Sequence, residues 1–364
     1  MDDKKFNEML VQMSKEDLDA FLRKSGEPFD TFANDLAAGE IEELAPPFYD
    51  YVTFSGGLLD YYKVFFEKYR RYLKRINEET WTFVNTTMEV IIKHNSGIQV
   101  KFNLMNECEK LMEAILQSLG AYLEGLPNIA YNNLERVFVA DNMHLLNLLP
   151  QARFKGSLFR VRGKRGLNNP KELFHTPFEL RNSCGSYRFS ILGYPSLYLA
   201  TSLETSLAEC RIDDTEYSAI CFRNEQLLEC VDLSLLRGEL CFWERYCLVL
   251  FYPLIFACGL KVKEENKPFK PEYVVPQILF QIINEHSTLM GVLYTSTRME
   301  KPDYRNPTQK NLVLIVPKAF QADGQSKELA KMFNCTIPVS PNEGENPCSV
   351  EKRLLKMELS ELTI

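Results

Sequence analysis

The pattern of apolar residues changes near Pro150, and this change constrains the fold more than any other feature of the sequence. Before it, apolar residues recur at helical spacing, most clearly over 58–76 and 104–123. Such stripes predict amphipathic helices with one face against a core. After it, residues 157–164 alternate apolar and polar side chains, which is typical of a half-buried strand. We therefore predict an α+β protein, mainly α-helical at first and mixed α/β afterwards.

Three parts of the chain follow from this pattern. Residues 1–150 are expected to form a helical domain with a regulatory or partner-binding role, and the turn signal at 25–28 is expected to end its first helical run. Residues 151–320 contain the predicted short strands and form the second domain. Residues 321–364 are a C-terminal extension, in which a Pro-, Asn-, Gly- and Glu-rich linker precedes a helix at 350–362.

Acidic residues are concentrated in the first part of the chain. Residues 1–150 contain 15 Lys and Arg against 24 Asp and Glu, and the rest contains 27 against 25. An anion site in the second part therefore requires a local cluster of arginines. The basic residues of the 58–76 helix would suit a nucleic-acid surface. Because their surroundings are acidic, the solvated face of an amphipathic helix is the favoured interpretation, and no direct nucleic-acid partner is expected.

The cysteines and the apolar runs of the sequence indicate where in the cell the protein is located. The chain has ten cysteines, no CxxC pair and four scattered histidines, and its first residues lack the basic-then-apolar pattern of a signal peptide. We expect reduced thiols, a cytoplasmic location and no metal site. The longest apolar run is the 14 residues that start at Cys247. It is short for a membrane span, so we expect a buried helix and no membrane association.

The stretch 187–211, YRFSILGYPSLYLATSLETSLAECR, combines a loop, a turn, a short strand and a helix start. The strand is predicted at 196–200. Thr201 and Glu204 have the spacing of a capping box, which predicts that a helix begins there. That helix would carry Glu209 away from its apolar face and among small side chains, so a ligand could approach the carboxylate closely.

A larger set of residues in and around this stretch resembles the RES domain over about residues 155–317. The matching positions are Phe159-Arg160-Val161, Tyr187-Arg188-Phe189, Gly193, Tyr198, Ala208-Glu209, Gly291, Tyr294 and Ser296, supported by Tyr273, Gln277 and Asn311. The resemblance implies a fold similar to that of ADP-ribosyltransferases for the second domain, which would be catalytic. The helical first 150 residues are an addition that compact members of that family lack.

The resemblance also implies a function. Members are toxins of bacterial toxin–antitoxin pairs that destroy NAD or transfer its ADP-ribose. NAD would be the substrate, with no separate cofactor, and an antitoxin with a helix-turn-helix part would be a protein partner.

The catalytic residues implied by the resemblance are Glu209, Arg188 and Ser296. Breaking the bond between nicotinamide and ribose develops positive charge on the sugar, as in glycoside cleavage. A fixed carboxylate beside that sugar stabilises the charge, so Glu209 is the first candidate. Arg188 would bind the pyrophosphate through its forked guanidinium group, and Ser296 would hydrogen-bond the ribose or the carboxamide.

Four further residues are expected to bind substrate. Arg160 would bind the pyrophosphate together with Arg188. Tyr187 and Tyr198 would stack on or flank the nicotinamide, and Asn311 would hydrogen-bond the ribose or the carboxamide. Taken singly, each has an ordinary structural role as well: arginines on strands form ion pairs, and tyrosines fill cores. His175 lies close by in sequence, and a structural role before a proline turn is favoured for it.

Three functions stay open at this point. The leading one is cleavage of NAD with water or phosphate as the acceptor. The second keeps the fold and transfers ADP-ribose to a protein side chain. The third is a binding module without turnover, because Phe189-Ser190 stands where many family members have Trp-Asn.

Overall fold

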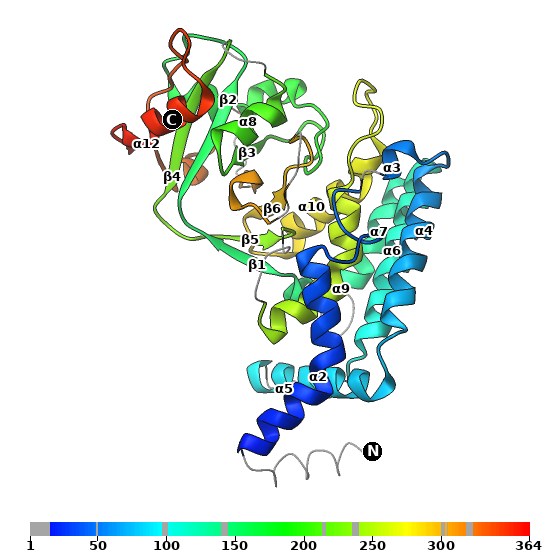
Figure 1. Ribbon diagram of the computed structural model, residues 1–364. Helices are drawn as coiled ribbons and strands as arrows, with labels where there is room; N and C mark the ends of the chain where they lie inside the picture. The colour runs from blue at the N-terminus through cyan, green and yellow to red at the C-terminus, as the bar shows by residue number, and fades with distance from the viewer. Residues whose placement is uncertain are drawn as a thin grey trace.

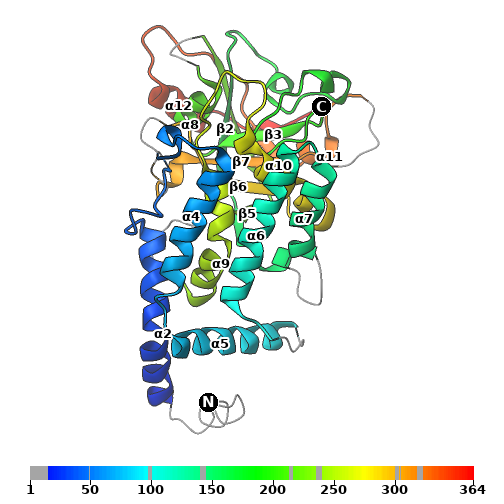
Figure 2. The same ribbon diagram turned by 90° about the vertical axis from the view of Figure 1, so that its right-hand side faces the viewer.

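The computed structural model describes residues 15–48, 50–96, 101–139, 145–212, 216–234, 240–299, 303, 305–317 and 323–364. Within these residues it is an α+β protein, in which a bundle of helices packs against one side of a nine-stranded sheet (Figure 1). Turned by 90°, the long helices run roughly alongside one another beneath the sheet, and α5 crosses their far end (Figure 2). The predicted fold class is confirmed.

The first part of the chain is helical, as predicted. Its elements are α2 (Lys15–Ala38), α3 (Asp50–Thr53), α4 (Leu58–Leu73), α5 (Glu78–Ser96), α6 (Leu104–Leu123), α7 (Pro127–Val139) and the 3-10 turn η1 (Leu145–Leu148). The predicted break at 25–28 is wrong, because α2 runs through Pro28. A proline in a helix removes one hydrogen bond. Phe29, Ala33 and Leu36 follow it and are buried at helical spacing, and their burial offsets that loss.

Two helices from later in the chain complete this bundle. α9 (Phe242–Gly259) and α10 (Val274–His286) lie between the sheet and the helices α4, α6 and α7 (Figure 1). All of them share one continuous apolar core. The predicted division of the chain at residue 150 remains a prediction, but removing residues 1–150 would expose the surfaces of α9 and α10 that face this core.

The apolar run at Cys247 forms α9, as expected. By length and composition α9 is the one helix among the described residues that is able to cross a membrane, and 72% of it is buried inside the protein. Tyr69 and Tyr252 illustrate its packing: their rings stack at 5.6 Å, and the Tyr69 hydroxyl donates to the backbone oxygen of Val249. α9 is therefore packed as a central core helix.

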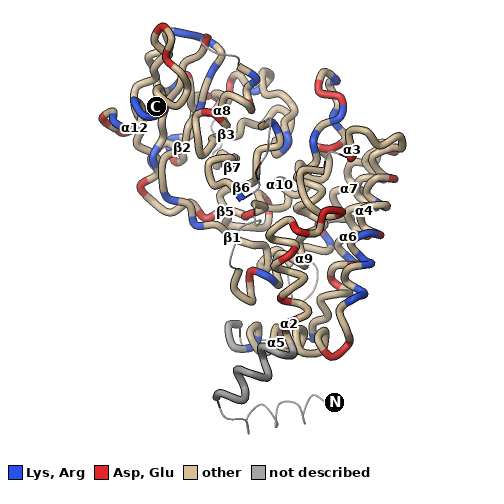
Figure 3. Tube along the Cα trace, viewed as in Figure 1, with Lys and Arg blue, Asp and Glu red and all other residues tan. Residues whose placement is uncertain are grey.

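The basic residues of α4 pair with nearby carboxylates. Arg70 contacts Glu67 and Glu109, with its Nε 2.8 Å from Oε2 of Glu109. Arg71 and Lys68 form further ion pairs with residues outside α4. Basic and acidic residues are interspersed along the chain in this part of the molecule (Figure 3). These contacts support the interpretation of α4 as an amphipathic helix with a solvated face.

The sheet has the order β1-β5-β6-β7-β3-β2-β4-β8-β9. The strands are β1 (Gln151–Phe154), β2 (Ser157–Arg162), β3 (Ser196–Ala200), β4 (Ser218–Asn224), β5 (Leu228–Asp232), β6 (Gly291–Thr295), β7 (Lys310–Ile315), β8 (Phe333–Cys335) and β9 (Ser360–Glu361). The pair β5–β6 is parallel and the other pairs are antiparallel. The sequence predicted β3 with its observed bounds.

Along the central strands, successive side chains point to opposite faces of the sheet. Tyr294 and Val313 face the helical core, whereas Leu293, Leu312 and Leu314 face a second apolar cluster. That second cluster includes residues of the 3-10 turns η2 (Pro170–Leu173) and η3 (Phe178–Ser183) and of α11 (Lys327–Ala330). Polar residues at the ends of these strands are thereby placed on a defined side of the sheet.

The helices α8 (Leu203–Cys210) and α12 (Pro347–Lys356) cover β2 and β4 through a third apolar cluster. Thr201 was expected to begin the helix with a capping box. Instead Ser202 caps α8, because its hydroxyl oxygen accepts from the backbone N–H of Thr205. The terminal helix was expected over 350–362. It begins and ends earlier, since Asn346 caps it and the chain after Lys356 leads into β9.

Candidate functional site

A pocket of about 640 Å³ opens where β2 and β3 diverge. These strands share a single paired position, Phe159 with Ala200, so the later residues of β2 and the first residues of β3 line a gap. The loop 183–190, the end of α8 and the segment between α9 and α10 supply the other walls. The volume lies within the usual range for small-molecule sites.

The pocket lining is strongly cationic. Its charged side chains are Arg160, Arg162, Arg188, Arg211, Lys270 and Arg298 against Glu209 and Glu265. The second part of the chain is nearly neutral, so this is the local cluster of arginines that an anion site requires. Burial lowers the pKa of the Arg160 guanidinium, and the like charge of Arg162 lowers it further.

Glu209 lies in the last turn of α8 with its carboxylate held at both oxygens. Its Oε1 accepts from the Ser296 hydroxyl at 2.6 Å and from the Asn311 amide nitrogen at 2.7 Å. Its Oε2 lies 3.3 Å from Nε of Arg298. The side chain is 26% exposed and lines the pocket. The carboxylate is therefore fixed and still accessible to a ligand.

Ser296 and Asn311 reach Glu209 because they sit at neighbouring strand ends. Asn311 is paired with Tyr294 across β6 and β7, and Ser296 follows directly after β6. Both side chains are buried, and neither lines the pocket. Ser296 Oγ also accepts from the backbone N–H of Arg298 at 3.2 Å. In this geometry the serine and the asparagine orient Glu209 from behind.

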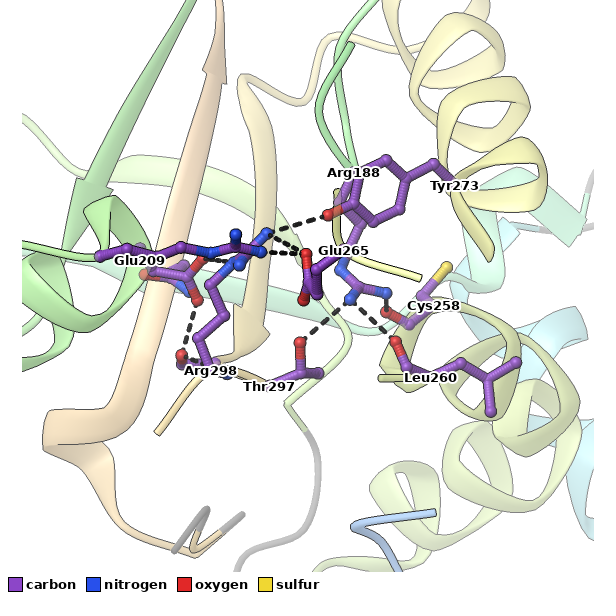
Figure 4. A network of polar contacts seen from close by, with 11 residues as sticks. Arg188, Glu209, Cys258, Leu260, Glu265, Tyr273, Thr297 and Arg298 are labelled. Atoms are coloured by element: carbon purple, nitrogen blue, oxygen red, sulfur yellow. Dashed lines mark hydrogen bonds and ion pairs between the residues drawn. The ribbon is translucent and has the colours of Figure 1, made fainter. Parts of the chain in front are cut away.

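Arg188 is built into the wall of the pocket. Its two terminal nitrogens donate to the backbone oxygens of Cys258 at 2.9 Å and Leu260 at 2.8 Å, and to the Thr297 hydroxyl at 3.0 Å (Figure 4). Its guanidinium also lies 5.1 Å from the ring centre of Tyr273. The last carbonyl groups of a helix lack partners within the helix. Arg188 satisfies those at the end of α9 and so joins the 183–190 loop to the helical bundle.

The two tyrosines predicted to bind substrate lie together in the pocket. Their rings pack edge to face, 5.8 Å apart. Tyr198 is held from behind, since its hydroxyl accepts from the backbone N–H of Phe189 at 3.2 Å, whereas Tyr187 is 56% exposed. Arg160 Nη1 donates to the backbone oxygen of Tyr198 at 3.4 Å. Arg160, Tyr187 and Tyr198 are thus brought to one wall.

The charged pocket residues Arg298, Arg211 and Glu265 were not predicted. Arg298 donates to the Tyr273 hydroxyl at 3.3 Å and links Glu209 to Glu265 across the pocket (Figure 4). Its place two residues after Ser296 was a signal for it. Glu265 comes from the segment between α9 and α10, and nothing local in the sequence connects it to the site.

Titration of the network follows from these contacts. Burial lowers the pKa of Arg298, but Tyr273, Glu209 and Glu265 raise it by more, so the pKa lies above its ordinary value.

His175 is outside the pocket lining; its Nε2 accepts from the backbone N–H of Ser326 at 2.8 Å, which supports the structural role favoured for it. Among the described residues no group of three or more His, Cys, Asp and Glu could hold a metal ion.

No family model matches this chain, and no solved structure matches it. The chain is similar to a protein of Bacillus subtilis (strain 168) named "Putative toxin YopC", with 25% identity over 261 residues. The similarity covers 65% of this chain and 59% of that protein, so the chain spans about three fifths of its relative's length. The resemblance to the RES domain continues to rest on the residues quoted above and stays a prediction.

Proposed function

We propose that this protein is a toxin-like enzyme that cleaves the bond between nicotinamide and ribose in NAD. The observation that carries the proposal is the carboxylate of Glu209. It is fixed at Oε1 by Ser296 and Asn311, and it lines a pocket with three times as many cationic as acidic side chains. A pre-oriented carboxylate in a cationic pocket suits a substrate that joins a pyrophosphate to a bond cleaved through a cation-like sugar.

The reaction balances without a metal or a second cofactor. The bond from ribose C1′ to the nicotinamide nitrogen breaks, and its electron pair leaves with nicotinamide, which departs as a neutral base. Water adds to C1′ and loses one proton, which gives ADP-ribose. With phosphate as acceptor, the product is ADP-ribose 1″-phosphate. In both cases Glu209 stabilises the charge on the ribose and accepts a hydrogen bond from a ribose hydroxyl.

The other residues in and behind the pocket take separate roles in this proposal. Tyr187 and Tyr198 form an aromatic wall against which a nicotinamide ring would lie. Ser296 and Asn311, which were expected to touch substrate, act as positioning residues for Glu209. Arg188 positions the 183–190 loop, because its donors are engaged by Cys258, Leu260 and Thr297.

The similarity to a protein named as a toxin supports the biological side of the proposal. An enzyme that consumes NAD removes a metabolite on which all cells depend, and unrestrained activity would stop growth. A protein inhibitor, such as the antitoxin implied by the RES resemblance, and a cytoplasmic site of action belong to the same proposal.

Release of nicotinamide tests the proposed function. Purified full-length protein is incubated with NAD, with and without phosphate, and products are separated by liquid chromatography. Free nicotinamide with ADP-ribose identifies hydrolysis, and a phosphorylated product that forms only with phosphate identifies phosphorolysis. ADP-ribose attached to protein would point to the transferase alternative. Absence of nicotinamide under every condition, from protein free of bound inhibitor, would contradict the proposal and favour the binding module.

A further inference from the structure

Two arginines of the pocket converge on a single carboxylate oxygen. Arg298 places Nη2 3.3 Å from Oε2 of Glu265, and Arg211 contacts the same oxygen through its own Nη2. All three residues line the pocket. The chain brings them from three separate places: the residue after α8, the segment between α9 and α10, and the segment after β6.

The backbone directs both arginines to this point. Arg211 ends α8 in the left-handed conformation, with φ of 53°, as the C-terminal cap of that helix. A non-glycine residue in this region is uncommon, and it turns the chain sharply. Arg298 is held by two hydrogen bonds: its backbone N–H donates to Ser296 Oγ, and its Nη2 donates to the Tyr273 hydroxyl. The two guanidinium groups are therefore positioned by elements of the fold.

We infer that Arg211 and Arg298 form the seat for a phosphate group of the substrate, and that Glu265 occupies this seat while the pocket is empty. Forked guanidinium groups bind carboxylate and phosphate oxygens with the same geometry. A pyrophosphate offers more acceptor oxygens and more negative charge than one carboxylate. It displaces Glu265, whose side chain is 29% exposed and belongs to the segment that links two helices.

Arg188, the residue first expected to bind pyrophosphate, is a weaker candidate. Arg188 is a buried residue, and its donors are engaged by backbone oxygens at the end of α9. The side chain of Arg211 is 48% exposed, and its partner Glu265 offers a carboxylate that another anion is able to replace. The seat is thus formed by arginines whose present partner is an anion.

The position of the seat agrees with the chemistry of NAD, and this step rests on the proposed function. Arg298 contacts Glu209 at one side and Glu265 at the other. In NAD the pyrophosphate is attached to the 5′ carbon of the ribose whose C1′ bond is cleaved, so the phosphate and the reacting sugar are neighbours. As Arg298 binds phosphate, its ion pair with Glu209 weakens, and the Glu209 carboxylate becomes available to the sugar cation.

Calorimetry with two probes, inorganic pyrophosphate and ADP-ribose, tests the seat without requiring turnover. In the full-length protein, we expect Arg211→Gln and Arg298→Gln each to weaken binding by about tenfold or more, the loss typical of a charge-assisted contact. Glu265→Gln should tighten binding several-fold, because it removes the competing charge. Arg223→Gln is the matched control, since Arg223 is an exposed arginine of β4 outside the pocket lining.

The outcomes separate the seat from the proposed function. Unchanged binding in both arginine variants, or weaker binding in Glu265→Gln, would overturn the seat, provided that the melting temperatures match the wild type. Binding that depends on the arginines in a protein that never releases nicotinamide would uphold the seat and reject cleavage. Nicotinamide release with unchanged KM in both arginine variants would uphold cleavage and reject the seat.

Discussion

Ser296 donates its hydroxyl hydrogen to the carboxylate of Glu209 at 2.6 Å, although 87 positions separate the two residues in the chain. The contact joins the end of β6 to the last turn of α8. Asn311 adds a second donor to the same oxygen at 2.7 Å. The orientation of Glu209 therefore depends on the register of β6 with β7.

Removing either donor should slow turnover more than it weakens substrate binding. For Ser296→Ala and Asn311→Ala we expect kcat for nicotinamide release to fall by roughly 10- to 100-fold, because a loosely held carboxylate stabilises the sugar cation poorly. KM should change little. Ser360→Ala on the exposed strand β9 is the control and should behave as wild type. A large rise in KM with kcat unchanged would instead assign the two residues to substrate binding.

Arg188 should contribute to stability through its bonds to the end of α9. We expect Arg188→Ala to lower the free energy of unfolding by about 3 kcal/mol, since charged donors are lost and buried carbonyl groups are left without partners. Arg188→Lys should recover only part of this, because an ammonium group lacks the planar fork. Denaturant unfolding measures both. Unchanged stability with a raised KM for NAD would show that Arg188 binds pyrophosphate after all.

Because His175 is buried, we expect the protein to lose stability in mild acid. Burial lowers its pKa from the ordinary 6.5 to about 4, so the folded protein disfavours the charged form. The stabilising contribution is present above pH 6.5 and is lost as the pH falls toward 4. Between pH 7 and pH 5 we expect the free energy of unfolding to fall by about 2 kcal/mol from this residue. His175→Gln should be less stable at pH 7 and show a shallower acid slope; an unchanged slope would contradict the assignment.

Gly291 should tolerate no side chain. A Cβ atom there would lie 1.9 Å from the backbone oxygen of Val313, which belongs to the neighbouring strand β7. Gly291→Ala must push β6 away from β7, and we expect a loss above about 3 kcal/mol or failure to fold. Gly156→Ala is the matched control, because its nearest contact would be an ordinary 3.5 Å from the Phe154 ring. Comparable expression and melting temperature of the two variants would contradict this.

Local patterns in the sequence predicted the elements that carry the site but not its network. Period-two alternation located β2 and β3, and Glu209 was found on the helix that follows. The start of α8 was misjudged by one residue because Thr201 and Ser202 are both able to cap a helix. Ser202 is chosen because its hydroxyl also donates to the backbone oxygen of Thr308, a contact made only in the folded chain.

The long-range contacts were beyond any local signal. Nothing in the sequence around Arg188 indicates that its donors meet the end of α9, about 70 positions away. Glu265 likewise reaches the pocket only because α9 and α10 pack against the sheet. Local propensity alone predicts a helix end at Pro28, because it takes no account of the buried side chains that follow this residue.

Comparison of two glutamate variants of α8 decides whether the Glu209 carboxylate drives the cleavage of NAD. Glu209→Gln and Glu204→Gln alter the same helix by the same chemical change, but Glu204 is exposed and does not line the pocket. We predict that the wild type and Glu204→Gln release nicotinamide from NAD at similar rates, and that Glu209→Gln loses at least about a hundredfold of that rate while remaining folded. Equal rates in the two variants would show that Glu209 does not stabilise the sugar cation.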